Sequence, residues 1–365
     1  MQHFAVNPYL YCSEQIMKMR KILVFVCALF ASQLVKAQDP HFSQFFASPL
    51  TLNPAFTGKF SGTWRLAANH RDQWPSIPKA YVTTSASIDF PILKSTIPEN
   101  DVFGVGISGL TDASANNILK LNYGSVSMSY HKALDENGYS TIGAGFQATY
   151  SSLNLDMTKL TFETQLGQNG FDQSIPSGET FDRGPNQSYF DINAGLLYSG
   201  STNGENNFYL GASMYHINRP KVNFSTYGTD PSGNRVDFPT WYLSGRISLH
   251  GGGSFPISDM LTVHTSVIHQ MQNKASETIL GAAIAANLSQ DAEKPSAIYL
   301  GSWVRLNDAV IPYVGLEFGG LRIGVSYDFN ISNLKAATAS RGGSEFSIIF
   351  IKRPADYQGI PCPKF

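Results

Sequence analysis

The sequence has few cysteines, little charge and no long apolar run. Cys12 and Cys27 lie near the N-terminus, so a mature chain without that region keeps Cys362 alone and forms no internal disulfide. Charged residues make up only 15% of the chain, below the ~25% typical of soluble domains. A formal net charge of −1 lacks the basic excess that nucleic-acid binding requires. Composition therefore favours an exported, weakly charged β-protein, either an outer-membrane barrel or a soluble β-sandwich array.

The N-terminal region predicts export. A basic stretch precedes the apolar run Ile22–Ala31, and the segment after it ends in small residues suited to a signal peptidase. Cleavage between Ala37 and Gln38 is the expected result. Ten apolar residues are too few for a spanning helix, which needs about 20. We therefore expect residues 1–37 to be a signal peptide, with residues 1–16 upstream of the true start.

Downstream, the chain repeats segments of about ten residues in which apolar and small or polar side chains alternate, the period of a β-strand. In Thr141–Ser151, for example, Phe146 and Tyr150 share one face, and Gln147 and Thr149 share the other. A barrel in lipid turns the apolar set outward and the polar set into the lumen. The fold class is therefore all-β, a transmembrane antiparallel barrel over residues 59–353. About 14 strands are expected, centred on Leu66, Ser85, Val105, Val126, Phe146, Ala194, Gly211, Gly245, Val263, Ile284, Ser302, Val314, Val325 and Ile348.

The same alternation assigns charged and aromatic side chains to faces of the barrel. Charges on the polar face are expected to form a structural network in the lumen, in preference to a transport path. These are Arg65, Asp89, Asp191, Arg246, Arg305, Glu317 and Arg322. Aromatic residues near strand ends fit a girdle at the lipid–water boundary. They are Trp74, Tyr81, Phe90, Tyr130, Tyr150, Tyr189, Tyr198, Trp241, Trp303 and Tyr327.

Two glycine-rich motifs match the sequence patterns of enzyme sites, but their surroundings in the sequence do not. Gly104–Gly109 has the dinucleotide-binding spacing, but it lies inside an alternating segment and no helix follows. His250–Gly253 resembles a lipase oxyanion loop without the nucleophile elbow that accompanies it, so we expect a periplasmic turn there. The histidines and cysteines have no metal-ligand spacing. We therefore expect no catalytic residue, cofactor or metal.

Residues 38–58 do not alternate and form a leader to the barrel. Asp39 suits a helix N-cap, Pro40 the first helical position, and Pro49 the stop of that helix. The leader is expected either to plug the lumen or to brace the strand ends. The residues that we expect to act in it are Phe42, Phe45 and Phe46, which share one face, and Asn53, which begins a turn.

A barrel with a periplasmic N-terminus places alternate connections outside. The two longest, 152–188 and 216–240, fall on the external side, as outer-membrane proteins prefer. The first, 70–79, contains Arg71 and Trp74, which we expect to hold that loop in shape. Long loops on a rigid scaffold usually carry partner contacts.

Several segments together resemble the PorP/SprF family of outer-membrane proteins, which is associated with type IX secretion and gliding motility. The N-terminal signature consists of Gln38-Asp39-Pro40, Phe42-Ser43-Gln44-Phe45, Pro49-Leu50, Asn53-Pro54-Ala55 and Gly58. Three further stretches agree, namely Arg71-Asp72-Gln73-Trp74, Tyr327-Asp328-Phe329-Asn330 and Cys362-Pro363-Lys364-Phe365.

The resemblance implies a non-enzymatic role in secretion or surface anchoring of a type IX cargo, such as an adhesin with a C-terminal sorting domain. Other components of the secretion machinery are further expected partners, and outer-membrane lipid surrounds the barrel. Residues 354–365 are expected to be a periplasmic tail. Fold logic alone also allows a passive porin for small solutes.

Overall fold

The computed structural model describes residues 39–77, 80–177, 184–224, 227–229, 234–237, 240–289 and 296–353. From Pro40 onward these residues belong to one compact unit, Pro40–Phe365. The expected signal peptide 1–37, its cleavage site at Ala37 and Gln38, and the tail 354–365 with Cys362 lie outside the described residues.

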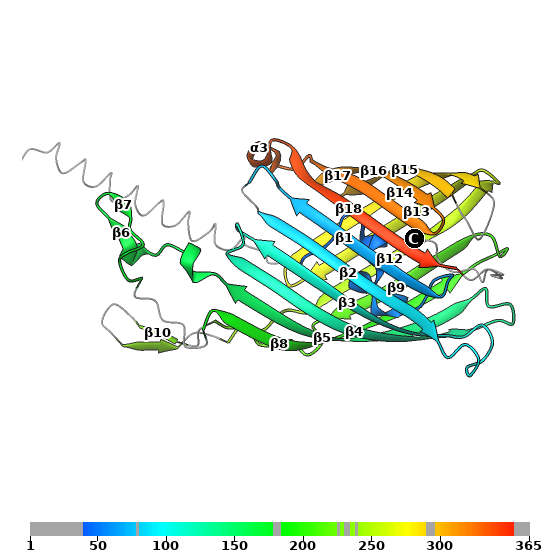
Figure 1. The fold of residues 1–365 in the computed structure, drawn as a ribbon, viewed down its shortest axis with the longest axis horizontal. Helices are drawn as coiled ribbons and strands as arrows, with labels where there is room; N and C mark the ends of the chain where they lie inside the picture. The colour runs from blue at the N-terminus through cyan, green and yellow to red at the C-terminus, as the bar shows by residue number, and fades with distance from the viewer. Residues whose placement is uncertain are drawn as a thin grey trace, which may run out of the picture. The chain divides into compact units, whose positions relative to one another are not determined.

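Fourteen strands close into an antiparallel barrel, which confirms the predicted fold class and strand number (Figure 1). Each strand pairs with its neighbours in chain order, and β1 closes the ring by pairing with β18, Trp64 opposite Lys352. The strands are β1 (Trp64–Gln73), β2 (Tyr81–Ile92), β3 (Val102–Ser114), β4 (Leu119–Ala133), β5 (Thr141–Leu155), β8 (Asn186–Gly200), β9 (Asn207–Tyr215), β12 (Arg246–Ser258), β13 (Leu261–Gln272), β14 (Ala275–Ser289), β15 (Ser296–Arg305), β16 (Ala309–Phe318), β17 (Leu321–Asn330) and β18 (Arg341–Lys352).

The strand faces follow the predicted alternation. On β5, Phe146 is 59% exposed on the outer wall, whereas its neighbour Gln147 is 4% exposed and faces the lumen. The same pattern holds on β17, where Val325 is exposed and Ser326 is buried. The outer wall is thus apolar and suited to lipid, and the inner wall is polar.

The two ends of the barrel differ in the length of their connections. β1 begins and β18 ends at one end, which we call the periplasmic end, where short connections also lie. The two longest connections, after β5 and after β9, lie at the opposite, outer end (Figure 1). The connections at the outer end contain η4 (Met157–Lys159), η5 (Glu163–Gln165), α3 (Lys335–Thr338) and the hairpins β6 (Leu166–Gly167) with β7 (Gly170–Phe171) and β10 (Tyr227–Thr229) with β11 (Arg235–Asp237).

The prediction for the His250–Gly253 segment was wrong. These residues lie inside β12, not in a periplasmic turn, and the strand centre predicted at Gly245 falls one residue before β12 begins. The glycines serve packing within the wall. A Cβ at Gly252 would lie 2.7 Å from the Tyr209 hydroxyl, so glycine at this position leaves room for the Tyr209 ring.

The helix predicted from Pro40 to Pro49 was also wrong. The leader instead contains three short turns, η2 (Phe45–Ala47), α2 (Pro49–Leu52) and η3 (Pro54–Phe56). Pro49 and Pro54 each occupy the first helical position, where the missing N–H costs nothing, so each proline begins a turn. None of the described helices is long and apolar enough to cross a membrane.

Candidate functional site: the leader inside the barrel

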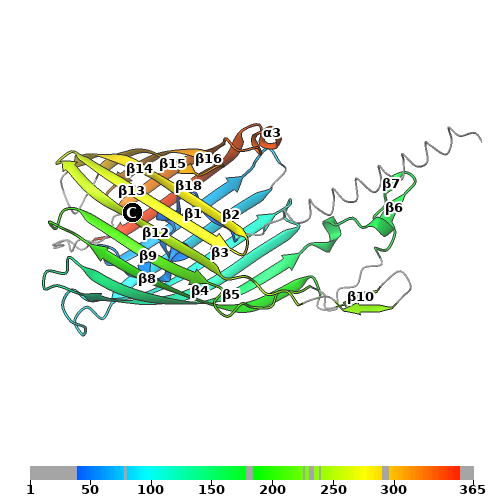
Figure 2. The ribbon, with the colours of Figure 1, turned by 180° about the vertical axis from the view of Figure 1, so that it is seen from behind.

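The leader lies inside the barrel. It is the dark blue segment seen within the ring of strands in both views (Figure 1 and Figure 2). Its residues bond strands on opposite sides of the ring, since Thr57 bonds Ser127 on β4 and Ser43 accepts from Arg305 on β15. Nearly every residue from Phe42 to Phe60 is buried, although several of them are polar.

Lumen-facing glycines form a groove that fits the leader closely. A Cβ at Gly145 would lie under 3.0 Å from the backbone of Pro54 and Ala55, and one at Gly104 would meet the Thr57 carbonyl. On β8, a Cβ at Gly195 would meet the Asn53 side chain. Because backbone atoms cannot move aside, these glycines fix where the leader lies.

At the periplasmic end, a buried ion pair holds the C-terminal part of the leader. Arg65 on β1 and Asp89 on β2 pair at 2.8 Å, and both are almost fully buried. Arg65 also donates to the Phe56 carbonyl at 2.9 Å, and Asp89 accepts from the Gly58 N–H at 2.7 Å. Each ion therefore satisfies a leader backbone group as well as its partner.

Midway along the lumen, Asn53 and two histidines hold the leader. The Asn53 amide donates to the Leu196 carbonyl at 3.0 Å and lies 3.0 Å from His250 Nε2. His131 Nε2 lies 2.7 Å from the Ala55 carbonyl and donates to it, since a carbonyl only accepts. The turn that the sequence predicted at Asn53 is thus bonded to β4, β8 and β12.

Aromatic packing fills the other side of the lumen. Phe46 stacks on Trp303 with ring centroids 4.7 Å apart and meets Tyr313 edge-on at 5.5 Å. Trp303 is 4% exposed, so its prediction as a girdle residue was wrong: it packs against the leader. A cavity of about 40 Å³ remains beside Phe46. Phe42 and Phe45 are buried, and Phe45 packs edge-on against Phe46.

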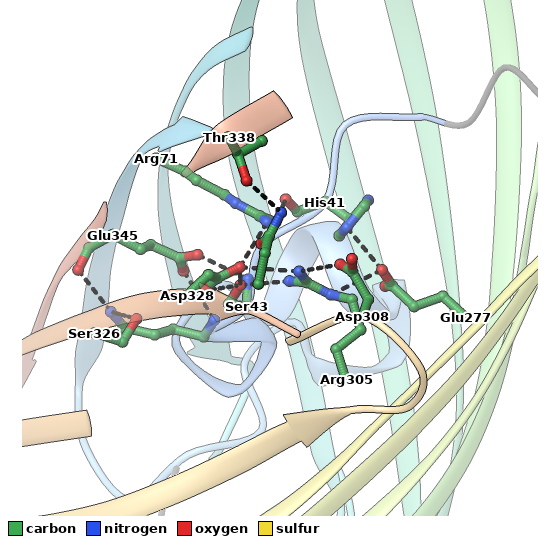
Figure 3. Close-up of polar contacts among 12 residues, drawn as sticks. His41, Ser43, Arg71, Glu277, Arg305, Asp308, Ser326, Asp328, Thr338 and Glu345 are labelled. Atoms are coloured by element: carbon green, nitrogen blue, oxygen red, sulfur yellow. Dashed lines mark hydrogen bonds and ion pairs between the residues drawn. The ribbon is translucent and has the colours of Figure 1, made fainter. Parts of the chain in front are cut away.

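At the outer end, charged residues bind the first residues of the leader (Figure 3). Asp328 on β17 accepts from Arg71 on β1 and Arg305 on β15, both at 2.9 Å. Its carboxylate also accepts from the Ser43 hydroxyl at 2.8 Å. We call this set the outer charge cluster, which comprises His41, Arg71, Glu277, Arg305, Asp328 and Glu345.

The cluster binds leader backbone as well as side chains. The two oxygens of Glu345 accept from the N–H groups of Ser43 and Gln44, at 2.7 and 2.9 Å. Arg71 donates to the His41 carbonyl at 2.8 Å, and His41 Nε2 lies 3.0 Å from Glu277 (Figure 3). Leader and barrel are therefore joined by charge-assisted hydrogen bonds, the stronger class in proteins.

The charged residues that the sequence predicted for the lumen all have partners there, but they do not form one network. Arg65 and Asp89 form one pair, and Glu317 and Arg322 form another at 2.6 Å. The remaining three contact residues outside the predicted set: Asp191 meets His216 at 2.7 Å, Arg246 lies over the Tyr215 ring at 4.3 Å, and Arg305 joins the outer charge cluster.

Arg71 and Trp74 do not share a loop as predicted. Arg71 lies in β1, 1% exposed and directed into the lumen, because the strand extends to Gln73. Trp74 follows the strand with a positive φ of 56° and packs edge-on against Tyr81 at 5.6 Å. Arg71 thus holds the leader, and Trp74 lies where the first outer connection begins.

Sequence reasoning did not single out His41, Glu277 or Glu345. The alternation places Glu345 on the lumen face of its segment, so its direction was readable from the sequence. Its leader partners, Ser43 and Gln44, lie about 300 residues away in the chain, and no local pattern encodes that pairing. Within the described ranges, no group of three or more His, Cys, Asp or Glu residues could hold a metal ion.

Fold and site together define an outer-membrane β-barrel whose lumen contains its own N-terminal segment. The chain belongs to the type IX secretion system membrane protein PorP/SprF family, whose profile matches residues 34–350. This match confirms the resemblance seen in the sequence, and with it the outer-membrane localisation.

Among solved structures, the toluene transporter TodX of Pseudomonas putida is similar at 10% identity and a TM-score of 0.47, covering 83% of this chain and 92% of that chain. The toluene transporter TbuX of Ralstonia pickettii has 11% identity and a TM-score of 0.45, covering 84% and 93%. Such distant similarity transfers no ligand or activity to this chain. No curated protein sequence matches it.

Proposed function

We propose that this protein is a closed outer-membrane scaffold that supports secretion and surface anchoring of a type IX partner, an adhesin. In this role it is not an enzyme, and its barrel does not conduct solutes. The observation that carries the proposal is the leader held along the lumen. Buried ion pairs at both ends bind it, and a Cβ at Gly104 or Gly145 would overlap its backbone.

Firm attachment of the leader favours a scaffold over a channel. Breaking a buried, hydrogen-bonded ion pair costs several kcal/mol, about 3–5 for one pair. The leader is bound by such groups at the two ends of its path, through Arg65–Asp89 and through Asp328 with Arg71. A solute path would need this packing to open.

The outer connections supply the surface for a partner. Large apolar side chains are exposed there, with Trp241 at 70% and Phe171 at 57%. Exposed apolar residues beyond the lipid-covered wall are typical of protein-binding surfaces. We infer that the partner docks on these connections and that other components of the secretion machinery act on the same complex.

The decisive test is surface display of the partner. Deletion of the gene should leave one large surface protein undelivered or unattached, and unchanged display of all type IX cargo would contradict the proposal. Replacing Trp241 and Tyr242 by serine should release the partner while the barrel stays assembled. Phe318→Ser is the matched control, because Phe318 is at least as exposed as these two residues but lies at the periplasmic end of β16.

The alternative is the passive porin. The polar inner wall favours it, since porin lumens are polar. Purified protein in planar bilayers distinguishes the two functions: a porin gives steady ion conductance, whereas a scaffold with the leader in place gives none.

A further inference from the structure

The leader runs through the lumen from the outer end of the barrel to the periplasmic end, where β1 begins. β1 begins at the periplasmic end, and the leader residues just before it, Phe56 and Gly58, bond Arg65 and Asp89 near that end. The first leader residues bond the opposite end. Ser43 meets Asp328 and Glu345, which lie toward the outer ends of β17 and β18.

The two attachment points are far apart along the barrel. Arg65 and Arg71 both lie on β1 and bind the two parts of the leader, six residues of strand apart. Six residues at 3.3 Å each give about 20 Å along the strand, or about 15 Å along the axis for a tilt near 40°. The apolar band of an outer-membrane barrel is about 25 Å tall, so the leader crosses more than half of it.

The leader residues become more exposed at the point where the chain reaches the outer end of the barrel. From Phe42 the leader is buried among lumen side chains, whereas Asp39, Pro40 and His41 are partly exposed.

We propose that the leader crosses the membrane inside its own barrel and presents the chain at Asp39 on the cell surface, where the expected cleavage after Ala37 leaves the N-terminal end of the mature protein. The external surface then includes a chain terminus in addition to the loops. This topology does not depend on the proposed function, because it follows from the contacts of the leader and from the orientation that places the long connections outside.

Single-cysteine labelling on intact cells tests the topology. In a Cys362→Ser background, Asp39→Cys should react with a membrane-impermeant maleimide on intact cells, as should Asp172→Cys, an exposed position in the outer connection after β5. Asp259→Cys, in the short turn between β12 and β13 at the periplasmic end, should react only after the cells are permeabilised.

Labelling of Asp39→Cys only after permeabilisation would overturn the proposal, as would no labelling at all when both controls behave as expected. A heat-modifiability gel confirms that each variant is an assembled barrel. If Asp39→Cys does not assemble, an epitope inserted before Asp39 provides a second measurement. Antibody binding to intact cells supports the proposal, and binding only in lysed cells contradicts it. Display of the adhesin is scored separately, so the two proposals can fail independently.

Discussion

At the scale of single residues, glycines, which have no side chain, position the leader as much as the side-chain contacts do. Gly104 on β3 and Gly145 on β5 face the lumen where the leader backbone approaches, and a Cβ at either position would overlap it. Glycine in a strand interior normally weakens the strand. Here it permits close approach, which explains part of the high glycine content, 32 residues in the chain.

Gly145→Ala should therefore destabilise the barrel, because its Cβ would meet the backbone of Pro54 and Ala55. Overpacking of this kind costs about 1–3 kcal/mol. The measurement is thermal unfolding in detergent, followed by the loss of heat-modifiable mobility. Gly124→Ala on β4 is the matched control, since nothing lies within 4 Å of its Cβ, and equal destabilisation by both changes would contradict a fitted groove.

Asp328→Asn tests the outer charge cluster. The change removes the charge that Arg71 and Arg305 share and leaves two buried guanidinium groups without it, which costs about 3–5 kcal/mol. The expected result is a much lower unfolding temperature. Asp237→Asn, in the exposed pair with Arg235, should change nothing measurable. A neutral result at Asp328 would show that the cluster does not hold the leader.

At the scale of elements, the leader packs as part of the barrel core. It has little secondary structure of its own, and side chains on β2, β4, β9 and β18 satisfy its backbone groups. A segment that gated the lumen would need a second arrangement with comparable contacts. The close fit to the glycine groove favours one fixed position.

A disulfide between leader and wall should thus leave function intact. Thr57 Oγ1 and Ser127 Oγ are 3.0 Å apart, so cysteines at these two positions are close enough to join. The oxidised double variant should display the partner as the wild type does, with the two single variants as controls. Loss of display on oxidation, restored by a reductant, would show that the leader moves during function.

At the scale of the whole molecule, the leader supplies groups that bond the polar inner wall of the barrel. The porin alternative requires water to take the place of those groups. We expect no steady conductance from wild-type protein in planar bilayers. A variant lacking residues 40–56 should conduct if it assembles, and steady conductance from the wild type would contradict the scaffold proposal.

Substitution of Arg71 and Trp74 distinguishes an effect on barrel stability from an effect on partner binding. Alanine at both positions should lower the heat stability of the barrel more than it lowers partner display, because Arg71 binds the leader inside the lumen. The comparison is between the unfolding temperature and surface display in the same strain. A variant with wild-type stability and no display would instead place a partner contact here.

Local sequence patterns predicted the strands of the barrel wall well, but they predicted the packing inside the lumen poorly. The alternation of Phe146 with Gln147 placed β5 and its faces correctly, because a strand exposes one side chain in two to each environment. His250–Gly253 was misplaced because glycine marks turns and close packing alike, and only the position of Tyr209 distinguishes the two. Trp303 was misassigned because an aromatic side chain near a strand end suits either face.

By itself, the sequence determined the fold class, the number of strands, the inward direction of the charged side chains and the family, since each depends on short-range periodicity or on a contiguous motif. Only the tertiary structure decided that the leader fills the lumen and that Asp328, Glu345 and Arg71 meet at its outer end. Those partners lie about 260 to 300 residues apart in the chain, and they meet only because pairing of β1 with β18 closes the ring.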